Sequence, residues 1–366
     1  MSKRAEAPLV ISVPWPIRLF GDFQYFLGLP AIVAAVDLRT AISATRRADD
    51  RSYVKTPWNA EPIPVVPHDD TLEEPSLRRV LRTLTARGMA PEGGYDFQIL
   101  SRVPWRDALL DSAALAAAWT VSLLELGGKL SAMSGNDVAA LTAHAFEDEP
   151  PSARPIPEVY GAVLGGTLMV GHGEPPEIAT FERNVPGILA CSLPTSTAER
   201  RRAADTVLRI LSALADIVKT HPDFDIHKST LDDIVPKMCR MEDRVSTVAY
   251  AELMMRDLCR DAHRVLENEH GFDDDRLGEM LDGEHELLRD YLGYNDPAVE
   301  TMLQTAVGCG ALGGKILTES SGFILFAPSR EDEVARTVRQ AGVEAHVTPV
   351  SDGMRIERVH GKGATA

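Results

Sequence analysis

Cysteine is scarce in this chain: 366 residues contain only four, Cys191, Cys239, Cys259 and Cys309. They lie far apart and form no CxxC pair, a pattern that favours free thiols in a reducing compartment over a disulfide framework. No HExxH motif or Cys/His framework is present, and His263 and His270 lack the spacing of a metal-binding pair on a helix face. The sequence therefore gives no signal for a zinc centre.

Long apolar segments are also missing. The first apolar run, residues 9–13, is short and is broken by Pro14 and Pro16, unlike the apolar region of a signal peptide. No stretch is long enough to span a bilayer. We therefore expect a cytoplasmic protein.

Basic residues are fewer than acidic ones: the chain has 38 Lys and Arg and 54 Asp and Glu, which gives a formal net charge of −16. No basic block offsets this acidity, which argues against nucleic acid or an anionic membrane as a partner. A phosphate-bearing ligand would need Arg or Lys placed locally at its site.

What the sequence does contain is typical of a globular protein of two domains. Apolar residues make up 44% and charged residues 25% of the chain, and 366 residues can bury a large core. No internal repeat is visible. A change of pattern near residue 185 separates a sheet-rich half from a half of mixed helices and strands.

Hydrophobic periodicity and turn residues predict the individual elements. Strands are expected at 9–13, 31–36, 40–45, 188–193, 315–317, 323–327, 344–350 and 353–358, with a buried strand or hairpin at 160–170. Helices are expected at 75–87, 111–126, 137–147, 198–220, 243–268, 274–291, 297–308 and 330–341. The Pro-rich segment 46–75 is expected to be a long loop or β-ribbon, and 150–157 a loop.

The most informative segment is 18–38, which reads RLFGDFQYFLGLPAIVAAVDL. It resembles the first motif of the mevalonate kinase branch of the GHMP kinases, P-G-K-x-x-L-F-G-E-H-x-x-x-x-G-x-P-A-I-x-x-A-I-D-L. The apolar and Gly/Pro frame is kept. Pro16 stands in place of the motif's Lys, Asp22 in place of its Glu and Phe23 in place of its His.

Three further segments resemble the same family, in the same order. Residues 104–115 match P-x-G-x-G-L-G-S-S-A-A-L, but the loop glycines are replaced by Arg106, Ala108 and Leu110, and the first serine by Asp111. Residues 281–288 match the helix M-N-x-N-H-x-L-L with His285 in register. Residues 310–323 match G-A-L-G-A-K-L-T-G-A-G-G-G-G closely over 310–316, but the glycine run that follows is reduced to Gly322. Four ordered matches identify the chain as a member of this superfamily.

The resemblance implies an α+β fold of two domains. Residues 1–185 would form the N-terminal domain, a ribosomal-protein-S5-like α/β domain. Residues 186–366 would form the C-terminal domain, a ferredoxin-like α+β domain.

The resemblance also implies a nucleotide site, built from Arg106, Asp111, Ser112, Lys315, Ser320 and Ser321. Glycine-rich loops hold phosphate with backbone N–H groups, so side chains at these positions obstruct that approach. At about 4 Å and an effective dielectric constant of about 20, the Asp111 charge would repel a phosphate by roughly 4 kcal/mol. Arg106 could offset this, or a Mg²⁺ held by Asp111 could reverse it, and Asp111 could instead be a helix N-cap. Lys315 is either a phosphate contact or a solvated cation beside a strand.

For catalysis, a gapless match back from Gly165 and Gly166 puts Glu158 at the position of the family's catalytic Asp. Glu158 is then either a general base for an alcohol or a solvated loop carboxylate. Arg18 is either a relocated catalytic cation or a surface charge. Asp22 is either a substrate-side acid or a turn-stabilising residue, and His285 is assigned to the substrate side by its register.

Three functions remain open at this point. The first is a kinase that uses ATP and Mg²⁺ to phosphorylate the hydroxyl of a mevalonate- or sugar-like acceptor. The second is a non-catalytic (pseudokinase) binding or regulatory protein, favoured by the loss of glycines in both phosphate loops. The third is another enzyme in the same cleft. A small molecule is the expected partner in each, and relatives occur as monomers and as homodimers.

Overall fold

The computed structural model describes residues 8–66, 72, 74–101, 113–193, 199–238, 242–268, 273–318 and 322–358. The chain divides into two compact units that are each discontinuous in sequence. Unit 1 comprises Met1–Ile17, Ala35–Gly166 and Ser351–Ala366, and unit 2 comprises Arg18–Ala34 and Thr167–Val350. The long strands β1 (Leu9–Phe20) and β2 (Ala31–Arg46) contribute residues to both. The linear boundary near residue 185 remains a prediction.

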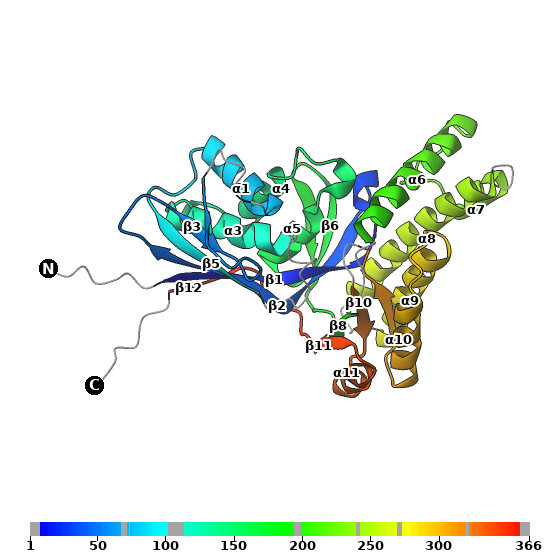
Figure 1. The fold of residues 1–366 in the computed structure, drawn as a ribbon. Helices are drawn as coiled ribbons and strands as arrows, with labels where there is room; N and C mark the ends of the chain where they lie inside the picture. Colours follow the sequence, from blue (N-terminus) through cyan, green and yellow to red (C-terminus); the bar gives the residue numbers. More distant parts are fainter. Residues whose placement is uncertain are drawn as a thin grey trace. The chain divides into compact units, whose positions relative to one another are not determined.

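Unit 1 is built on a sheet with the strand order β12-β1-β2-β5-β3-β4 (Figure 1). The remaining strands are β3 (Tyr53–Lys55), β4 (Ile63–Pro64), β5 (Tyr95–Ser101) and β12 (Arg355–Arg358). β5 pairs antiparallel with β2, from Thr40 opposite Ser101 to Arg46 opposite Tyr95, and β3 pairs parallel with β5. Burial alternates along β5, which is the pattern of a sheet with one face on the core and one in water.

The helices of unit 1 lie on one side of this sheet: α1 (Pro75–Ala86), α3 (Ala113–Leu126), α4 (Gly135–His144) and α5 (Ile156–Leu164) (Figure 1). Every residue of α3 from Ala113 to Leu124 is buried, so this helix is central to the unit. The Trp119 ring packs edge-on against Phe97 with centroids 4.6 Å apart, and its indole N–H donates to the carbonyl oxygen of Leu77. α3 is thereby fixed to both the sheet and α1.

The strand or hairpin predicted at 160–170 is partly wrong. α5 occupies the first half of that range, and strand β6 (Thr167–Gly173) begins only after Gly165 and Gly166, both with positive φ. The helix is almost wholly buried, so it lacks the polar face that would have shown a helical period. Pro157 suggested a loop, yet proline is well tolerated in the first turn of a helix.

Unit 2 contains a four-stranded antiparallel sheet in the order β11-β8-β10-β9. Its strands are β8 (Ile188–Ser192), β9 (Gly313–Ile316), β10 (Gly322–Phe326) and β11 (Glu344–Val347). The hairpin of β6 and β7 (Pro176–Thr180) pairs with Ala31–Ala34 of β2. The described helices are α6 (Glu199–Thr220), α7 (Leu231–Met238), α8 (Asp243–Leu266), α9 (Asp274–Asp290), α10 (Pro297–Gly308) and α11 (Glu331–Gln340).

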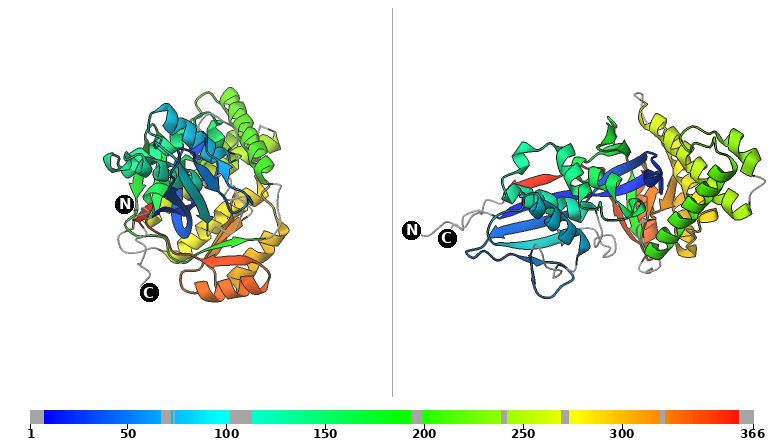
Figure 2. Two further views of the ribbon diagram at one scale, coloured as in Figure 1. Left: turned by 60° about the vertical axis from the view of Figure 1, so that its left-hand side comes forward. Right: turned by 90° about the horizontal axis from the view of Figure 1, so that it is seen from above.

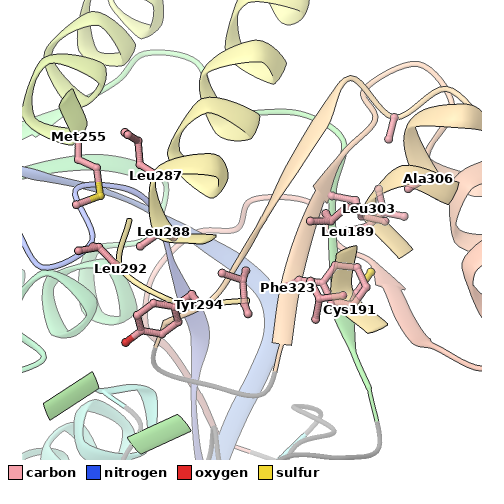
Figure 3. Close-up of a cluster of buried hydrophobic side chains, with 14 of the residues drawn as sticks. Leu189, Cys191, Met255, Leu287, Leu288, Leu292, Tyr294, Leu303, Ala306 and Phe323 are labelled. Carbon is pink, nitrogen blue, oxygen red and sulfur yellow. The ribbon is translucent and has the colours of Figure 1, made fainter. Parts of the chain in front are cut away.

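Helices α6 and α7 both pack against α8, and all three are seen from two further directions in Figure 2. The main core of unit 2 joins the sheet to helices α6, α8, α9, α10 and α11 (Figure 3), while α7 packs in a separate small cluster with α6 and α8. It includes Leu189, Cys191, Met255, Leu287, Leu288, Leu292, Tyr294, Leu303, Ala306 and Phe323. The predicted mixed α+β fold is confirmed. Strands β5 and β7 and helix α7 were not predicted.

Cys191 and Cys259 are buried free thiols and Cys309 is a half-buried one, while Cys239 lies outside the described residues. Burial raises the pKa of both buried thiols, which keeps them protonated and unreactive. Among the described helices, none combines the length and apolarity needed to cross a membrane.

Candidate functional site

The turn that follows β1 carries the first predicted site residue. Gly21 has φ +86°, and a Cβ there would lie 2.8 Å from the carbonyl oxygen of Pro30, so this position requires glycine. Phe23 also has a positive φ, and its ring packs in the core with its centroid 5.8 Å from that of Tyr294. Asp22, between them, is 2% exposed. The Phe that replaces the family's His therefore serves the core of unit 2.

Lys315 on β9 is completely buried beneath this turn. Its ammonium forms an ion pair with Asp22 Oδ2, donates to the carbonyl oxygen of Leu19 at 3.1 Å, and lies 3.6 Å from Glu284 Oε1. The hydroxyl of Thr318 donates to the other Asp22 oxygen at 2.6 Å. The alternative of a solvated cation is wrong, and the protein groups that surround the Lys315 ammonium argue against a phosphate contact.

Two further buried carboxylates complete what we call the buried ionic cluster, Asp22, Glu252, Glu284 and Lys315. Glu284 on α9 accepts hydrogen bonds from the backbone N–H groups of Gly21 at 3.0 Å and Asp22 at 3.2 Å. Glu252 on α8 accepts one from the amide of Gln24 at 2.6 Å. The cluster thus fixes the turn after β1 to helices α8 and α9 and to strand β9.

Charges in this cluster are unequal, since one ammonium faces three buried carboxylates. Burial opposes the ionisation of Asp22, but the charges of Lys315 and Arg18 outweigh it and hold the pKa of Asp22 below its usual value. Burial raises the pKa of Glu284 to about 7, against the pull of Lys315. Burial, together with repulsion from Glu284 and Asp22, raises the pKa of Glu252 well above normal. The surroundings of Glu252 therefore favour its protonated form.

His285 follows Glu284 on α9 and is 4% exposed. The backbone N–H of Ile316 donates to its Nδ1 at 3.4 Å, so its ring proton lies on Nε2 and is donated to Glu300 Oε1 at 2.8 Å. Burial lowers the pKa of His285, against the attraction of Glu300, which keeps the imidazole neutral. Both nitrogens are engaged within unit 2, so this geometry gives no support to a substrate contact.

Arg18, near the end of β1, is half-buried, and its positive charge lowers the pKa of Asp22. The structure therefore brings Arg18, Asp22 and Lys315 together in one electrostatic environment. A catalytic role for Arg18 remains a prediction.

Glu158, in unit 1, lies in the first turn of α5 and is 5% exposed. The alternative that it is a solvated loop carboxylate is wrong. α5 packs against both α3 and α4, which fixes the position of the turn that carries Glu158.

Five of the predicted nucleotide-site residues lie outside the described residues: Arg106, Asp111, Ser112, Ser320 and Ser321. Within the described parts of the chain, no group of three or more His, Cys, Asp and Glu side chains is placed to hold a metal ion. The assignment of ATP and Mg²⁺ to these loops therefore remains a prediction.

Sequence reasoning missed the structural importance of Gln24, Glu252, Glu284 and Thr318. A signal for Glu284 was available, because it directly precedes His285 in the matched segment 281–288. No comparable signal marks Glu252, which lies within an otherwise ordinary amphipathic helix.

Comparison with known proteins extends the similarity over almost the whole chain. The mevalonate kinase of Thermococcus sibiricus is 25% identical over 370 residues, covering 96% of this chain and 99% of the relative. The mevalonate kinase of Aeropyrum pernix is 27% identical over 367 residues, covering 94% and 97%. No family model matches the chain.

Solved structures show the same fold. Lactococcus lactis galactokinase, solved with galactose, superposes with a TM-score of 0.79 at 16% identity, over 95% of each chain. Methanococcus jannaschii mevalonate kinase superposes with a TM-score of 0.66 at 14% identity, over 94% of this chain and 98% of the other. Ordered motifs, full-length sequence similarity and shared fold agree: the chain is mevalonate kinase-like, and the proteins that it resembles in sequence and fold are GHMP kinases.

Proposed function

We propose that this protein is a small-molecule kinase that transfers the γ-phosphoryl group of ATP to a hydroxyl of a mevalonate- or sugar-like acceptor. The similarity to mevalonate kinases along nearly the whole chain supports this class of reaction. The acceptor class follows from relatives named as mevalonate kinases and from a fold neighbour solved with galactose.

The observation that carries the proposal is the position of Glu158. It is a buried carboxylate in the first turn of a helix, at the place where the motif alignment puts the family's catalytic acid. A solvated surface glutamate at this position would have argued against catalysis. Instead, its helix packs against two neighbours, which restricts where the carboxylate can lie, as a positioned proton acceptor requires.

In the proposed reaction, Glu158 accepts the proton of the acceptor hydroxyl as its oxygen attacks the γ-phosphorus. The new O–P bond forms as the bond to the β-phosphate oxygen breaks, and ADP leaves. When bound, ATP supplies the phosphoryl group and Mg²⁺ screens its charge. We assign their contacts to the loops carrying Arg106, Asp111, Ser112, Ser320 and Ser321, and withdraw Lys315 because its ammonium is enclosed by protein groups.

The test is product formation by the full chain with Mg-ATP and either mevalonate or galactose as the acceptor, with the product detected by ³¹P NMR. We expect one acceptor to give a phosphate monoester, and Glu158→Gln to slow its formation by about 10²- to 10⁴-fold. Glu92→Gln, at an exposed glutamate of the same unit, is the matched control and should leave the rate unchanged. Equal rates in wild type and Glu158→Gln would remove Glu158 from the mechanism.

The buried ionic cluster favours one alternative, a non-catalytic binding protein. Asp22, Lys315 and His285 are all engaged within unit 2, so stability alone would preserve these motif positions without any catalysis. Under this alternative, the full chain would bind an acceptor-like molecule but form no product with either acceptor. A repurposed enzyme would be indicated by Mg-ATP-independent conversion of the bound molecule.

A further inference from the structure

Helix α6 presents an apolar stripe to solvent. Among the described residues, three of the most exposed large apolar side chains lie on it: Leu208 at 66%, Val218 at 48% and Leu211 at 46%. Ala215 is exposed between the last two. The opposite face of α6, with Val207, Ile210, Ala213 and Ile217, is buried within unit 2. Helix α6 therefore carries two apolar faces: one is buried in the core of unit 2, and the other, the stripe, is exposed to solvent.

The spacing of the stripe is that of a coiled-coil seam. Residues 208, 211, 215 and 218 are separated by three, four and three positions, which corresponds to a-d-a-d of a heptad. The pattern is also symmetric about residue 213. If a second copy of α6 lay antiparallel, Leu208 would face Val218 and Leu211 would face Ala215, each contact occurring twice.

We propose that α6 is an antiparallel, two-fold contact with α6 of a second copy of this chain. Charge complementarity favours a second copy of this chain as the partner. The positions flanking the seam on one side are Asp205, Ser212 and Lys219, all exposed. Antiparallel pairing places Asp205 against Lys219 of the second copy, twice by symmetry, and Ser212 against Ser212.

The intramolecular alternative for Lys219 is weak. Its ion pair with Asp216 at 2.7 Å joins two exposed side chains, 73% and 39% accessible, and such pairs contribute little. A parallel arrangement would lose the pairing of Asp205 with Lys219. A two-fold axis also buries the apolar stripe of both copies in one contact. Because each copy uses the same surface, the assembly closes at two copies.

The contact is small. Residues 208–218 span about 15 Å of helix, well short of the surface that a tight interface buries. We therefore expect a reversible dimer with a dissociation constant in the micromolar range, weakened by salt because charged pairs flank the seam.

The first experiment is analytical ultracentrifugation of the full chain from about 1 to about 200 µM, a range that brackets the expected micromolar constant. We expect a monomer–dimer equilibrium, with Leu208→Glu weakening it at least about tenfold through a charge buried at the seam. Val307→Glu on α10 is the matched control, since Val307 is 49% exposed but lies off α6. The proposal would be overturned if the chain stayed monomeric across this range, or if Leu208→Glu and wild type had equal dissociation constants. It would also be overturned if the chain dimerised only with another protein present.

A charge exchange tests the antiparallel geometry, with surface changes that leave the fold intact. Asp205→Lys and Lys219→Asp should each weaken dimerisation, and the double variant should restore it to within about threefold of wild type. Within one helix these positions are about 21 Å apart, so restoration cannot come from an intramolecular pair. A double variant no tighter than the weaker single variant would refute this arrangement.

Discussion

Replacing Lys315 by methionine keeps a long apolar stem but removes the only cation that directly contacts Asp22 and Glu284 among the described residues. Asp22 would then either remain ionised with no cation in direct contact or take up a proton. Protonating a carboxyl with an ordinary pKa of 3.8 at pH 7 costs about 4 kcal/mol. Breaking a buried ion pair by removing one partner costs about 3–5 kcal/mol in general, which agrees.

The assay is urea denaturation of Lys315→Met followed by circular dichroism at pH 7 and pH 4. We expect a loss of about 4 kcal/mol in unfolding free energy at pH 7, and a smaller loss at pH 4, where protonation of Asp22 costs little. Lys228→Met, which breaks the exposed pair with Asp225, is the control and should change stability by less than about 1 kcal/mol. A loss at Lys315 no larger than at Lys228, or one independent of pH, would refute the reasoning.

Two further predictions concern the same cluster. Because folding raises the pKa of Glu284 from 4.5 to about 7, the folded chain holds a proton there that the unfolded chain releases, so this group's stabilising contribution falls as pH rises from 4.5 towards 7. Glu284→Gln should flatten that slope in a pH series of urea unfolding curves, and an unchanged slope would rule Glu284 out as its source. Gly21→Ala should destabilise by more than about 1 kcal/mol, because φ is +86° and the new Cβ would meet Pro30; thermal unfolding measures this, and an unchanged melting temperature would contradict it.

Much of the fold could be predicted, because motif and periodicity are local signals. The frame Leu19–Phe20–Gly21 carried the family resemblance, while the apolar runs 9–13 and 31–36 predicted parts of strands β1 and β2. The amphipathic helices α1 and α11 were predicted almost to the residue, since each has one clear apolar face. Helix α5 was not predicted because it is almost wholly buried and carries a proline in its first turn.

The candidate site was harder to predict, because its chemistry depends on residues far apart in the sequence. Lys315 reads as a surface cation until Asp22 and Glu284 are placed beside it, and the Asp22 contact spans 293 residues. Because Lys315 is buried, its charged ammonium is stable only beside carboxylates such as these. Glu158, in contrast, was assigned by alignment alone, and the structure adds its burial and its place on a helix.

The most direct test of the proposed phosphoryl transfer is calorimetric titration of Mg-ATP into wild type and Glu158→Gln, with turnover measured on the same samples. We predict that both proteins bind Mg-ATP with similar affinity, tighter than about 1 mM, and that only wild type forms product. Absence of binding at millimolar Mg-ATP, or full turnover by Glu158→Gln, would contradict the account.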